Sequence, residues 1–324
     1  MLLRGDMDAL PVVEETGLPY ASTNGNMHAC GHDLHTAGLV GAARLLSAHQ
    51  AELPGNVVFM FQPGEEGPGG AAPMVAEGVL DAAGVRADAA FGIHVLPGPR
   101  GVFNTRPATV MAGANIMRVT FNGMGGHGSM PEKALGPVPP LIEFCAALQT
   151  MVTRRFSVFD PVVATITNLS AGEAINVIPP SASMGASVRT LSAETTAEFP
   201  RRARQLAESI AAAHGCTAEF TFDSIYPVTV NDHAQTRFAL DTLTRVFGAD
   251  RVVELDTPRM GSEDFSYVLR EVPGTFCFLQ ASPPEVDPET AEMNHSPRVL
   301  FDDAVLADQA AALAVLAFAH NTGS

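Results

Sequence analysis

Met1-Leu2-Leu3-Arg4-Gly5-Asp6-Met7-Asp8 opens the chain as a short apolar run that leads directly into two carboxylates. Two later segments repeat this arrangement: the apolar run 57–61 precedes Glu65-Glu66, and the run 89–93 precedes His94. Short apolar runs of this kind are typical of buried strands. Because open α/β sheets bind their ligands at the carboxyl ends of the strands, we expect these titratable groups to meet at one edge of a sheet.

The regions between and after these strands predict two modules. Helix-forming, Ala-rich segments at 34–51 and 71–80 alternate with the strands, as in βαβ units. From residue 112 the pattern becomes the strand, helix, strand, strand, helix, strand order of a ferredoxin-like α+β domain, expected at 115–122, 137–157, 162–170, 182–191, 194–214 and 217–225. A helix (234–247), strand-like pieces (251–255, 275–280) and a last helix (303–320) then follow. We therefore expect one domain at 1–111 and 226–324, with residues 112–225 inserted into it.

Composition excludes several classes of partner. The chain has 324 residues and a formal net charge of −16, which repels nucleic acids and anionic membranes. The most apolar late segment is interrupted by Asp308 and Gln309, so we expect no membrane span. The four cysteines are scattered, which favours a reducing, cytoplasmic location without disulfides.

The chain begins with Met1-Leu2-Leu3, a sequence typical of the inside of a strand, and we expect the chain to be incomplete at its N-terminus.

The densest group of chemically active residues is Met27-His28-Ala29-Cys30-Gly31-His32-Asp33-Leu34-His35. Thiolates and imidazoles are good ligands for zinc and similar metals, and a neighbouring carboxylate such as Asp33 can orient a ligating imidazole. A capping turn with incidental histidines is the structural alternative. The density of ligands favours a metal site.

Glu65-Glu66, His94 and His295 are ambiguous when each is taken alone. The adjacent carboxylates suit a metal ligand beside a general base, but they also suit a solvated acidic turn. Each histidine alone is more often structural. Together with the cysteine segment they form an N/O/S set of a size suited to two metal ions, namely Cys30, His32, Glu66, His94 and His295.

The motifs of the whole chain, taken in order, resemble those of the aminoacylase/carboxypeptidase family of co-catalytic zinc peptidases, within its hippurate hydrolase and auxin-conjugate amidohydrolase branch. The resemblance rests on the segments 4–11, 28–33, 64–67, 92–95, 125–127, 176–179, 260–265 and 295–297. It implies a zinc-peptidase-like mixed α/β sheet with helices on both faces, interrupted by a smaller dimerisation domain. It also implies two divalent ions, Zn or Mn, and a homodimer.

The resemblance further implies roles for individual residues. Cys30 would be shared by both metals, His32, Glu66, His94 and His295 would complete the ligand set, and Glu65 would be the general base. His127 would stabilise the oxyanion in the partner subunit's active site. Asn176 would recognise substrate, and Arg189 is a plausible carboxylate partner because guanidinium binds carboxylates with two hydrogen bonds, although a solvated strand residue is an equal alternative. This chain has Gly128-Ser129 where the branch usually has Ala-Ala, and Glu132 where it usually has His.

The reaction implied is hydrolysis of the amide bond of an N-acyl amino acid, hippurate-like or a related conjugate, by a metal-activated water with Glu65 as base. A cysteine nucleophile at Cys30 is a poor second choice because of its metal-ligand setting. The sequence also leaves open a dipeptidase or carboxypeptidase of the same family, and an inactive, truncated metal-binding remnant.

Overall fold

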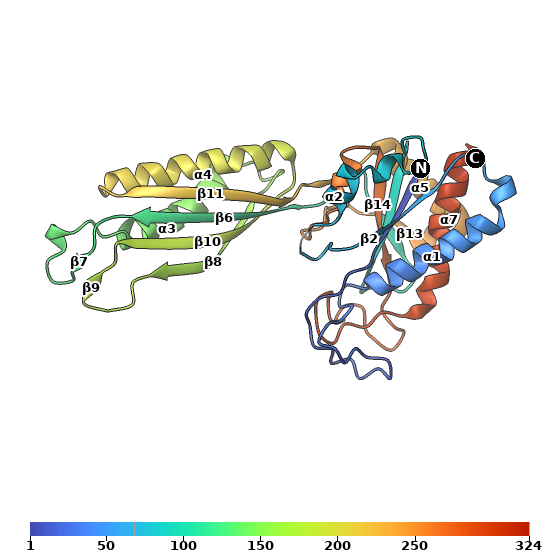
Figure 1. Cartoon of the computed structure of the whole chain (residues 1–324), viewed down its shortest axis with the longest axis horizontal. Helices are drawn as coiled ribbons and strands as arrows, with labels where there is room; N and C mark the ends of the chain where they lie inside the picture. Colours follow the sequence, from blue (N-terminus) through green and yellow to red (C-terminus); the bar gives the residue numbers. More distant parts are fainter. Residues whose placement is uncertain (68, 324) are drawn as a thin grey trace. The chain divides into compact units, whose positions relative to one another are not determined.

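The computed structural model describes residues 1–67 and 69–323, which divide into two compact units. The first unit comprises Met1–Val110, Thr229–Pro258 and Glu263–Ser324, and the second comprises Met111–Val228 and Arg259–Ser262. The chain therefore leaves the first unit after one third of its length and later returns to it, as the colours of Figure 1 show.

The first unit contains a six-stranded mixed sheet in the order β13-β4-β14-β3-β1-β2. Its strands are β1 (Leu2–Asp6), β2 (Val58–Gln62), β3 (Ala90–Leu96), β4 (Phe103–Thr105), β13 (Val252–Glu254) and β14 (Gly274–Gln280). β1 runs parallel to both β2 and β3, whereas β14 and β4 are antiparallel. The three strands predicted to end at titratable residues are thus neighbours in the order β3-β1-β2.

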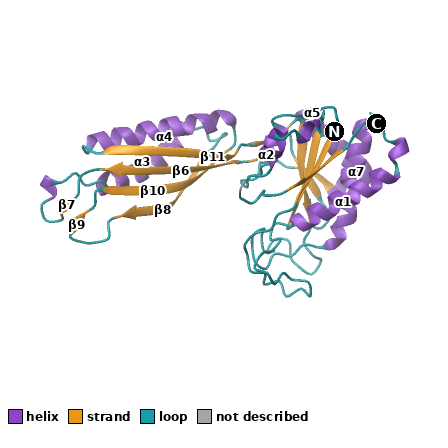
Figure 2. Cartoon of the chain, in the orientation of Figure 1, coloured by secondary structure: helices purple, strands orange, loops and turns teal. Residues whose placement is uncertain are grey.

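Three helices, α1 (His32–Ala48), α5 (His233–Phe247) and α7 (Leu306–Thr322), bury their apolar faces in the main hydrophobic core with Leu3 and Phe91 of the sheet. A Cβ on Gly5 would lie 2.8 Å from the backbone oxygen of His35, so α1 packs directly on β1. The short helices α2 (Ala71–Ala76) and α6 (Ser266–Leu269) complete the unit, and Figure 2 shows α2 across the sheet from α1 and α7. This mixed sheet with helices on both faces agrees with the predicted fold class.

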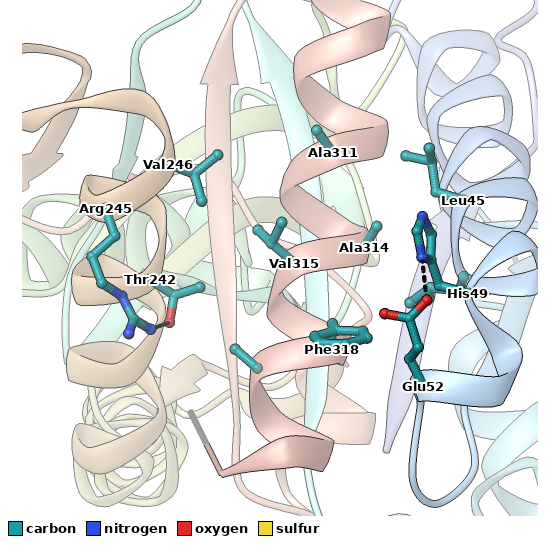
Figure 3. Close-up of a pocket in the computed structure, with 12 residues that line it drawn as sticks. Leu45, His49, Glu52, Thr242, Arg245, Val246, Ala311, Ala314, Val315 and Phe318 are labelled. Carbon is teal, nitrogen blue, oxygen red and sulfur yellow. Dashed lines mark hydrogen bonds and ion pairs between the residues drawn. The ribbon is translucent and has the colours of Figure 1, made fainter.

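An apolar groove of about 490 Å³ crosses the outer surface of α7 between α1 and α5 (Figure 3). Phe318 and Val315 of α7 form its floor, with the His49–Glu52 ion pair at one rim and Arg245 of α5 at the other. No residue predicted to act in catalysis or metal binding lines this groove.

The second unit is built on a four-stranded antiparallel sheet in the order β11-β6-β10-β8. Its strands are β6 (Gly113–Asn122), β8 (Val163–Ala171), β10 (Ser181–Thr190) and β11 (Thr217–Tyr226). Helices α3 (Val138–Arg155) and α4 (Ala193–Ala213) pack on it, and Phe121, Phe144 and Phe199 are fully buried in its core. The element order is the one predicted for a ferredoxin-like domain. A short ribbon of β7 (Gly126–His127) and β9 (Val177–Ile178) extends from it.

Some predicted elements differ from the structure. The helix expected at 71–80 ends at Ala76, because Gly78 adopts a left-handed φ of 92° and a separate 3-10 turn, η2 (Val79–Asp81), follows. Several very short elements were also not predicted, among them β4, α6, and the paired strands β5 (Ala108–Met111) and β12 (Thr229–Asn231).

One described stretch, Asp303–Thr322, is long and apolar enough to cross a membrane by length and composition alone. Half of its most apolar window is buried within the folded chain, and Leu313 and Leu316 belong to the main core. This stretch is therefore packed as a core helix of the first unit.

Candidate metal centre and active site

Titratable side chains gather where β1, β2 and β3 end. Asp6 closes β1, Glu65 follows β2, and His94 lies in β3, and all three side chains are buried. Asp6 pairs with Gln62 in the register of β1 and β2, so the segments after these two strands run side by side. The edge of the sheet thus brings carboxylates and imidazoles together within the first unit.

Cys30 and His32 reach this edge from the start of α1. Between them, Gly31 has a φ of 80°, and a Cβ there would lie 2.3 Å from Cγ2 of Val95, so only glycine fits this turn. The Sγ of Cys30 lies 3.5 Å from Nε2 of His94. The ligand atoms of Cys30, His32 and His94 all lie within 4.8 Å of one another.

Glu66 and His295 join the cluster from a second side. Nε2 of His295 lies 3.0 Å from Oε1 of Glu66, which is in turn 3.9 Å from Nε2 of His32. His295 is one of two non-glycine residues with positive φ in the described chain, at 75°. Strain of this kind is concentrated at functional sites. The five residues predicted as metal ligands therefore lie in one overlapping cluster.

The hydrogen bonds of His94 fix which of its nitrogens faces the cluster. Its Nδ1–H donates to the backbone oxygen of Val95 at 2.7 Å, which leaves a lone pair on Nε2 toward Cys30. Burial, followed by the nearby His35, lowers the pKa of His94 well below its ordinary value. His94 is thus held as a neutral imidazole, the form that binds metals.

Asp8, rather than Asp33, is the carboxylate beside His32, so the role suggested for Asp33 was wrong. Asp33 is exposed in the first turn of α1, whereas Oδ1 of Asp8 lies 3.3 Å from Nδ1 of His32. Asp8 also accepts the backbone N–H groups of Glu65 at 3.0 Å and Glu66 at 2.9 Å. One side chain therefore orients a ligand and fixes the loop that carries the two glutamates.

His35 and Asp6 also lie close to His32, but their polar atoms are already used. Nε2 of His35 accepts the backbone N–H of Val95 at 2.8 Å, so its Nδ1–H donates to Asp6. The other carboxylate oxygen of Asp6 accepts from Arg4. Arg4 and His35 hold the pKa of Asp6 well below its usual range, against the effect of burial. Both ring nitrogens of His35 and both carboxylate oxygens of Asp6 are thus hydrogen-bonded, and these residues support the cluster from behind.

The cluster itself has an unsatisfied atom that a cation would satisfy. Nε2 of His32 is buried, and among the described residues 1–67 and 69–323 it makes no hydrogen bond. Buried polar atoms without partners are rare in folded proteins. Burial, followed by the charge of Glu66, raises the pKa of the Cys30 thiol, and a bound cation would reverse that by stabilising the thiolate. The donor set of thiolate, imidazole and carboxylate fits zinc-type metals.

Glu65 lies beside this cluster in an electrostatically unusual position. It is 6% exposed, and its carboxylate lies within 4.8 Å of those of Glu263 and Asp264. Burial, followed by the charge of Glu263, raises the pKa of Glu65 well above its ordinary value. A raised pKa makes a carboxylate a stronger base, which is the property that a general base needs.

His127 and Asn176 belong to the second unit, where the β7–β9 ribbon brings them together. His127 pairs with Val177, and the backbone oxygen of Asn176 accepts from Gly128 at 2.8 Å. Both side chains are exposed. The backbone N–H of Ser129 donates to Nδ1 of His127 at 3.2 Å, so the neutral ring carries its hydrogen on Nε2, where it can be donated.

Arg189 lies elsewhere in the second unit, in β10. It is half-buried and donates from Nη1 to Oγ of Ser262 at 2.8 Å. Burial lowers its pKa. The alternative of a fully solvated strand residue is wrong, since the side chain is partly enclosed and hydrogen-bonded.

Sequence reasoning gave no individual role to Asp8, His35, Arg4 or Asn294. Asn294 donates from Nδ2 to Sγ of Cys30 at 3.4 Å, which favours a thiolate. Each of these residues lies in or beside a motif already singled out. Their partners are backbone groups or distant side chains, so spacing alone gave no signal for their roles.

Comparison with known proteins gives one consistent result. Residues 2–318 match the family model of peptidase family M20/M25/M40. The N-acetylcysteine deacetylase of Bacillus subtilis is 38% identical over 279 residues, which are 86% of this chain and 72% of that protein. The IAA-amino acid hydrolase ILR1-like 4 of Arabidopsis thaliana is 37% identical over 86% of this chain and 63% of its own length.

A solved structure agrees with the fold. The YXEP protein of Bacillus subtilis, described as a dinuclear metal binding peptidase, superposes with a TM-score of 0.84. It is 31% identical, and the match covers 99% of this chain and 81% of that protein. The likeness therefore includes both units of the chain.

Proposed function

Since the chain belongs to peptidase family M20/M25/M40, we propose that it hydrolyses the amide bond of N-acyl amino acids, hippurate-like or related conjugates. Family membership confirms the resemblance drawn from the motifs. The observation that supports the reaction best is the cluster of Cys30, His32, Glu66, His94 and His295 with Glu65 beside it. The named relatives, which include a deacetylase and an amino acid conjugate hydrolase, support an N-acyl amino acid as the substrate.

Two divalent ions, Zn or Mn, would be held by these five residues, with Cys30 as the shared ligand. Cys30 supports this role because its Sγ belongs to two of the ligand groups, one with His32 and His94 and one with Glu66 and His295. When bound, the ions supply positive charge that lowers the pKa of water and polarises the amide carbonyl. The dinuclear metal binding described for the YXEP protein supports a count of two.

The proton transfers fall to Glu65. Its carboxylate accepts a proton from the attacking water and then donates that proton to the nitrogen of the leaving amine. Two features support this role: the raised pKa of Glu65 and the hydrogen bond from its backbone N–H to Asp8. Divalent ions beside Glu66 would lower this pKa by stabilising the carboxylate.

Three residues of the second unit, His127, Asn176 and Arg189, would also act on the substrate. Nε2–H of His127 is suited to donate to the developing oxyanion of the partner subunit's reaction. Asn176, which immediately precedes β9, and Arg189 would bind the polar groups of the substrate, with Arg189 suited to its carboxylate.

We further propose that the protein is a homodimer joined through the second unit. β8 is an edge strand of its sheet, and its Val163 and Leu169 are 42% and 62% exposed. An apolar cavity of about 310 Å³ lies beside it, between Leu141 and Ile142 of α3 and Leu169. Open edges with exposed apolar residues favour pairing with another strand.

A cytoplasmic location is proposed from the four free cysteines.

The direct test is an assay of the purified chain, loaded with Zn or Mn, against N-acetyl, N-benzoyl and indoleacetyl amino acids and unmodified dipeptides. The proposal predicts hydrolysis of an N-acyl amino acid with a kcat/KM above that for the dipeptides. A preference for dipeptides would favour the peptidase reading. Absence of all turnover in a folded, metal-loaded dimer would favour the inactive remnant.

A further inference from the structure

The loop that carries Glu65 and Glu66 begins after β2 and ends at α2. Its two ends touch: a Cβ on Gly70 would lie 1.7 Å from the backbone oxygen of Pro63, and the N–H groups of Gly69 and Gly70 both donate to Gly64. The described part of the loop therefore forms a closed neck between Gln62 and Ala71. The contacts that hold this neck closed therefore also fix the position of Glu65 within the loop.

Asp264 binds both sides of that neck. Its Oδ1 and Oδ2 accept from Nε2 of Gln62 at 2.7 and 2.8 Å, and Oδ2 also accepts the backbone N–H of Ala71 at 2.9 Å. Gln62 is the last residue of β2, and Ala71 is the first residue of α2. Asp264 is 0% exposed, so water does not compete for these bonds.

Arg4 supplies the charge that makes a buried carboxylate tolerable at this position. Its Nη2 donates to Asp264 at 3.1 Å, and its Nε donates to Oε1 of Gln62 at 2.9 Å. Arg4 thus contacts the same pair of residues and closes a triangle of hydrogen bonds among β1, β2 and the 263–264 segment. Burying a carboxylate costs desolvation free energy, and oppositely charged and hydrogen-bonding partners offset that cost.

We propose that Asp264 is a positioning residue for catalysis: it clamps the neck of the Glu65-Glu66 loop and thereby fixes the general base relative to the metal ligands. Its carboxylate oxygens are occupied by Arg4, Gln62 and the backbone N–H of Ala71, so its effect on catalysis is exerted through the loop. This inference rests on the proposed function for its effect on turnover, but the clamp itself is a property of the folded chain and can be measured without substrate.

The test compares Asp264→Asn with a matched control. Asparagine keeps the shape but offers a single acceptor oxygen, so it cannot retain the contacts with Arg4, Gln62 and Ala71 together. Thr229→Val is the control, because Oγ1 of Thr229 donates to the backbone oxygen of Glu263 at 3.4 Å. This substitution removes a buried hydrogen bond from the same segment without affecting the loop. Both variants are expected to lower the melting temperature.

Only Asp264→Asn is expected to change the loop and the turnover. We expect kcat to fall about 10²-fold, because a displacement of a catalytic group by about 1 Å lowers the rate by about that factor. KM should stay within about threefold of the wild-type value. Hydrogen exchange of the peptide that contains Ala71 should rise on the order of tenfold as the neck opens locally. Thr229→Val should leave both kcat and this exchange within about twofold of wild type.

Gln62→Met is a second probe should Asp264→Asn fail to fold, because it cuts one side of the neck and leaves the Asp264 carboxylate in place. It should raise the exchange of the same peptide and lower kcat. Unchanged loop exchange in a folded Asp264→Asn or Gln62→Met protein would overturn the proposal, as would an equal loss of kcat in Thr229→Val. If wild type itself turns over no N-acyl amino acid, the proposed function fails, while the exchange data still decide the clamp.

Discussion

The Sγ of Cys30 lies 3.5 Å from Nε2 of His94, although the two residues come from a helix start and a separate strand. Nδ1 of His94 is hydrogen-bonded to the backbone oxygen of Val95, so it is Nε2 of His94 that faces the thiol. One metal ion could bind both atoms. Asn294 approaches the same sulfur from a third segment. This convergence makes Cys30 the residue on which metal binding depends most.

Cys30→Ser should therefore lower metal occupancy. A serine hydroxyl stays protonated at neutral pH and is a far poorer ligand than a thiolate. Elemental analysis after dialysis measures the effect, with Cys277→Ser as the control, because Cys277 is equally buried but lies outside every candidate ligand group. Full occupancy and full activity in Cys30→Ser would remove Cys30 from the ligand set.

Glu65→Gln should abolish hydrolysis while metal content stays near that of wild type. The amide keeps the size of the carboxylate and the backbone bond to Asp8, but it cannot accept a proton. The loss expected for a missing general base is about 10²–10⁴-fold in kcat. Metal analysis beside the turnover assay separates this effect from loss of the ions. A Gln variant that retains most of its activity would show that another group is the base.

Asp8→Asn should cost about 10–100-fold in activity or metal affinity, the usual range for a residue that orients a metal ligand. Asparagine can accept from only one of the two loop N–H groups that Asp8 binds. Asp33→Asn is the matched control, since Asp33 is exposed nearby and its substitution should change neither quantity. Equal behaviour of the two variants would contradict the orienting role.

The same carboxylate predicts a dependence of stability on pH. Hydrogen bonds from His32, Glu66 and Glu65 outweigh burial and lower the pKa of Asp8 from 3.8 to about 2. A lowered carboxylate pKa stabilises the folded state above the unfolded value, and this contribution is lost as pH falls from about 4 to about 2. The amount is at most about 2 kcal/mol, and solvent screening of the partly exposed group reduces it further. Urea unfolding at pH 5 and pH 3 should show a smaller loss in Asp8→Asn than in wild type.

His127→Ala should reduce kcat strongly and leave metal content and the dimer unchanged, because the residue would donate to the oxyanion without binding metal. Mixing His127→Ala with Glu65→Gln subunits gives heterodimers in which one site has an intact base and the partner's intact histidine. Recovery of activity in the mixture is expected. No recovery despite verified subunit exchange would exclude action across the dimer.

The parts of the site that could be predicted from sequence are those marked by local pattern. Apolar runs that stop at Asp6, Glu65 and His94 predicted strands that do lie side by side, and the density of the Cys30–His35 segment predicted its chemistry. Element order likewise predicted the ferredoxin-like unit, since each of its strands and helices is long enough to show its own period.

The rest depended on contacts between distant segments. His32 and His35 are alike in sequence, yet the N–H of Val95 occupies one nitrogen of His35 and leaves His32 available. The function of Asp8 follows from the register of β1 and β2, because its acceptor oxygens meet backbone groups of the next strand's loop. β4 was missed since it has three residues, two of them the polar but buried Asn104 and Thr105.

The central claim is that this chain is a hydrolase that depends on two metal ions bound by the Cys30 cluster. The most direct measurement is to strip the protein with a chelator, titrate Zn or Mn back, and record bound metal and hydrolysis of an N-acyl amino acid together. We expect no turnover in the stripped protein and its return as occupancy approaches two ions per chain. Full turnover by the metal-free protein, or binding that survives removal of both Cys30 and His94, would contradict it.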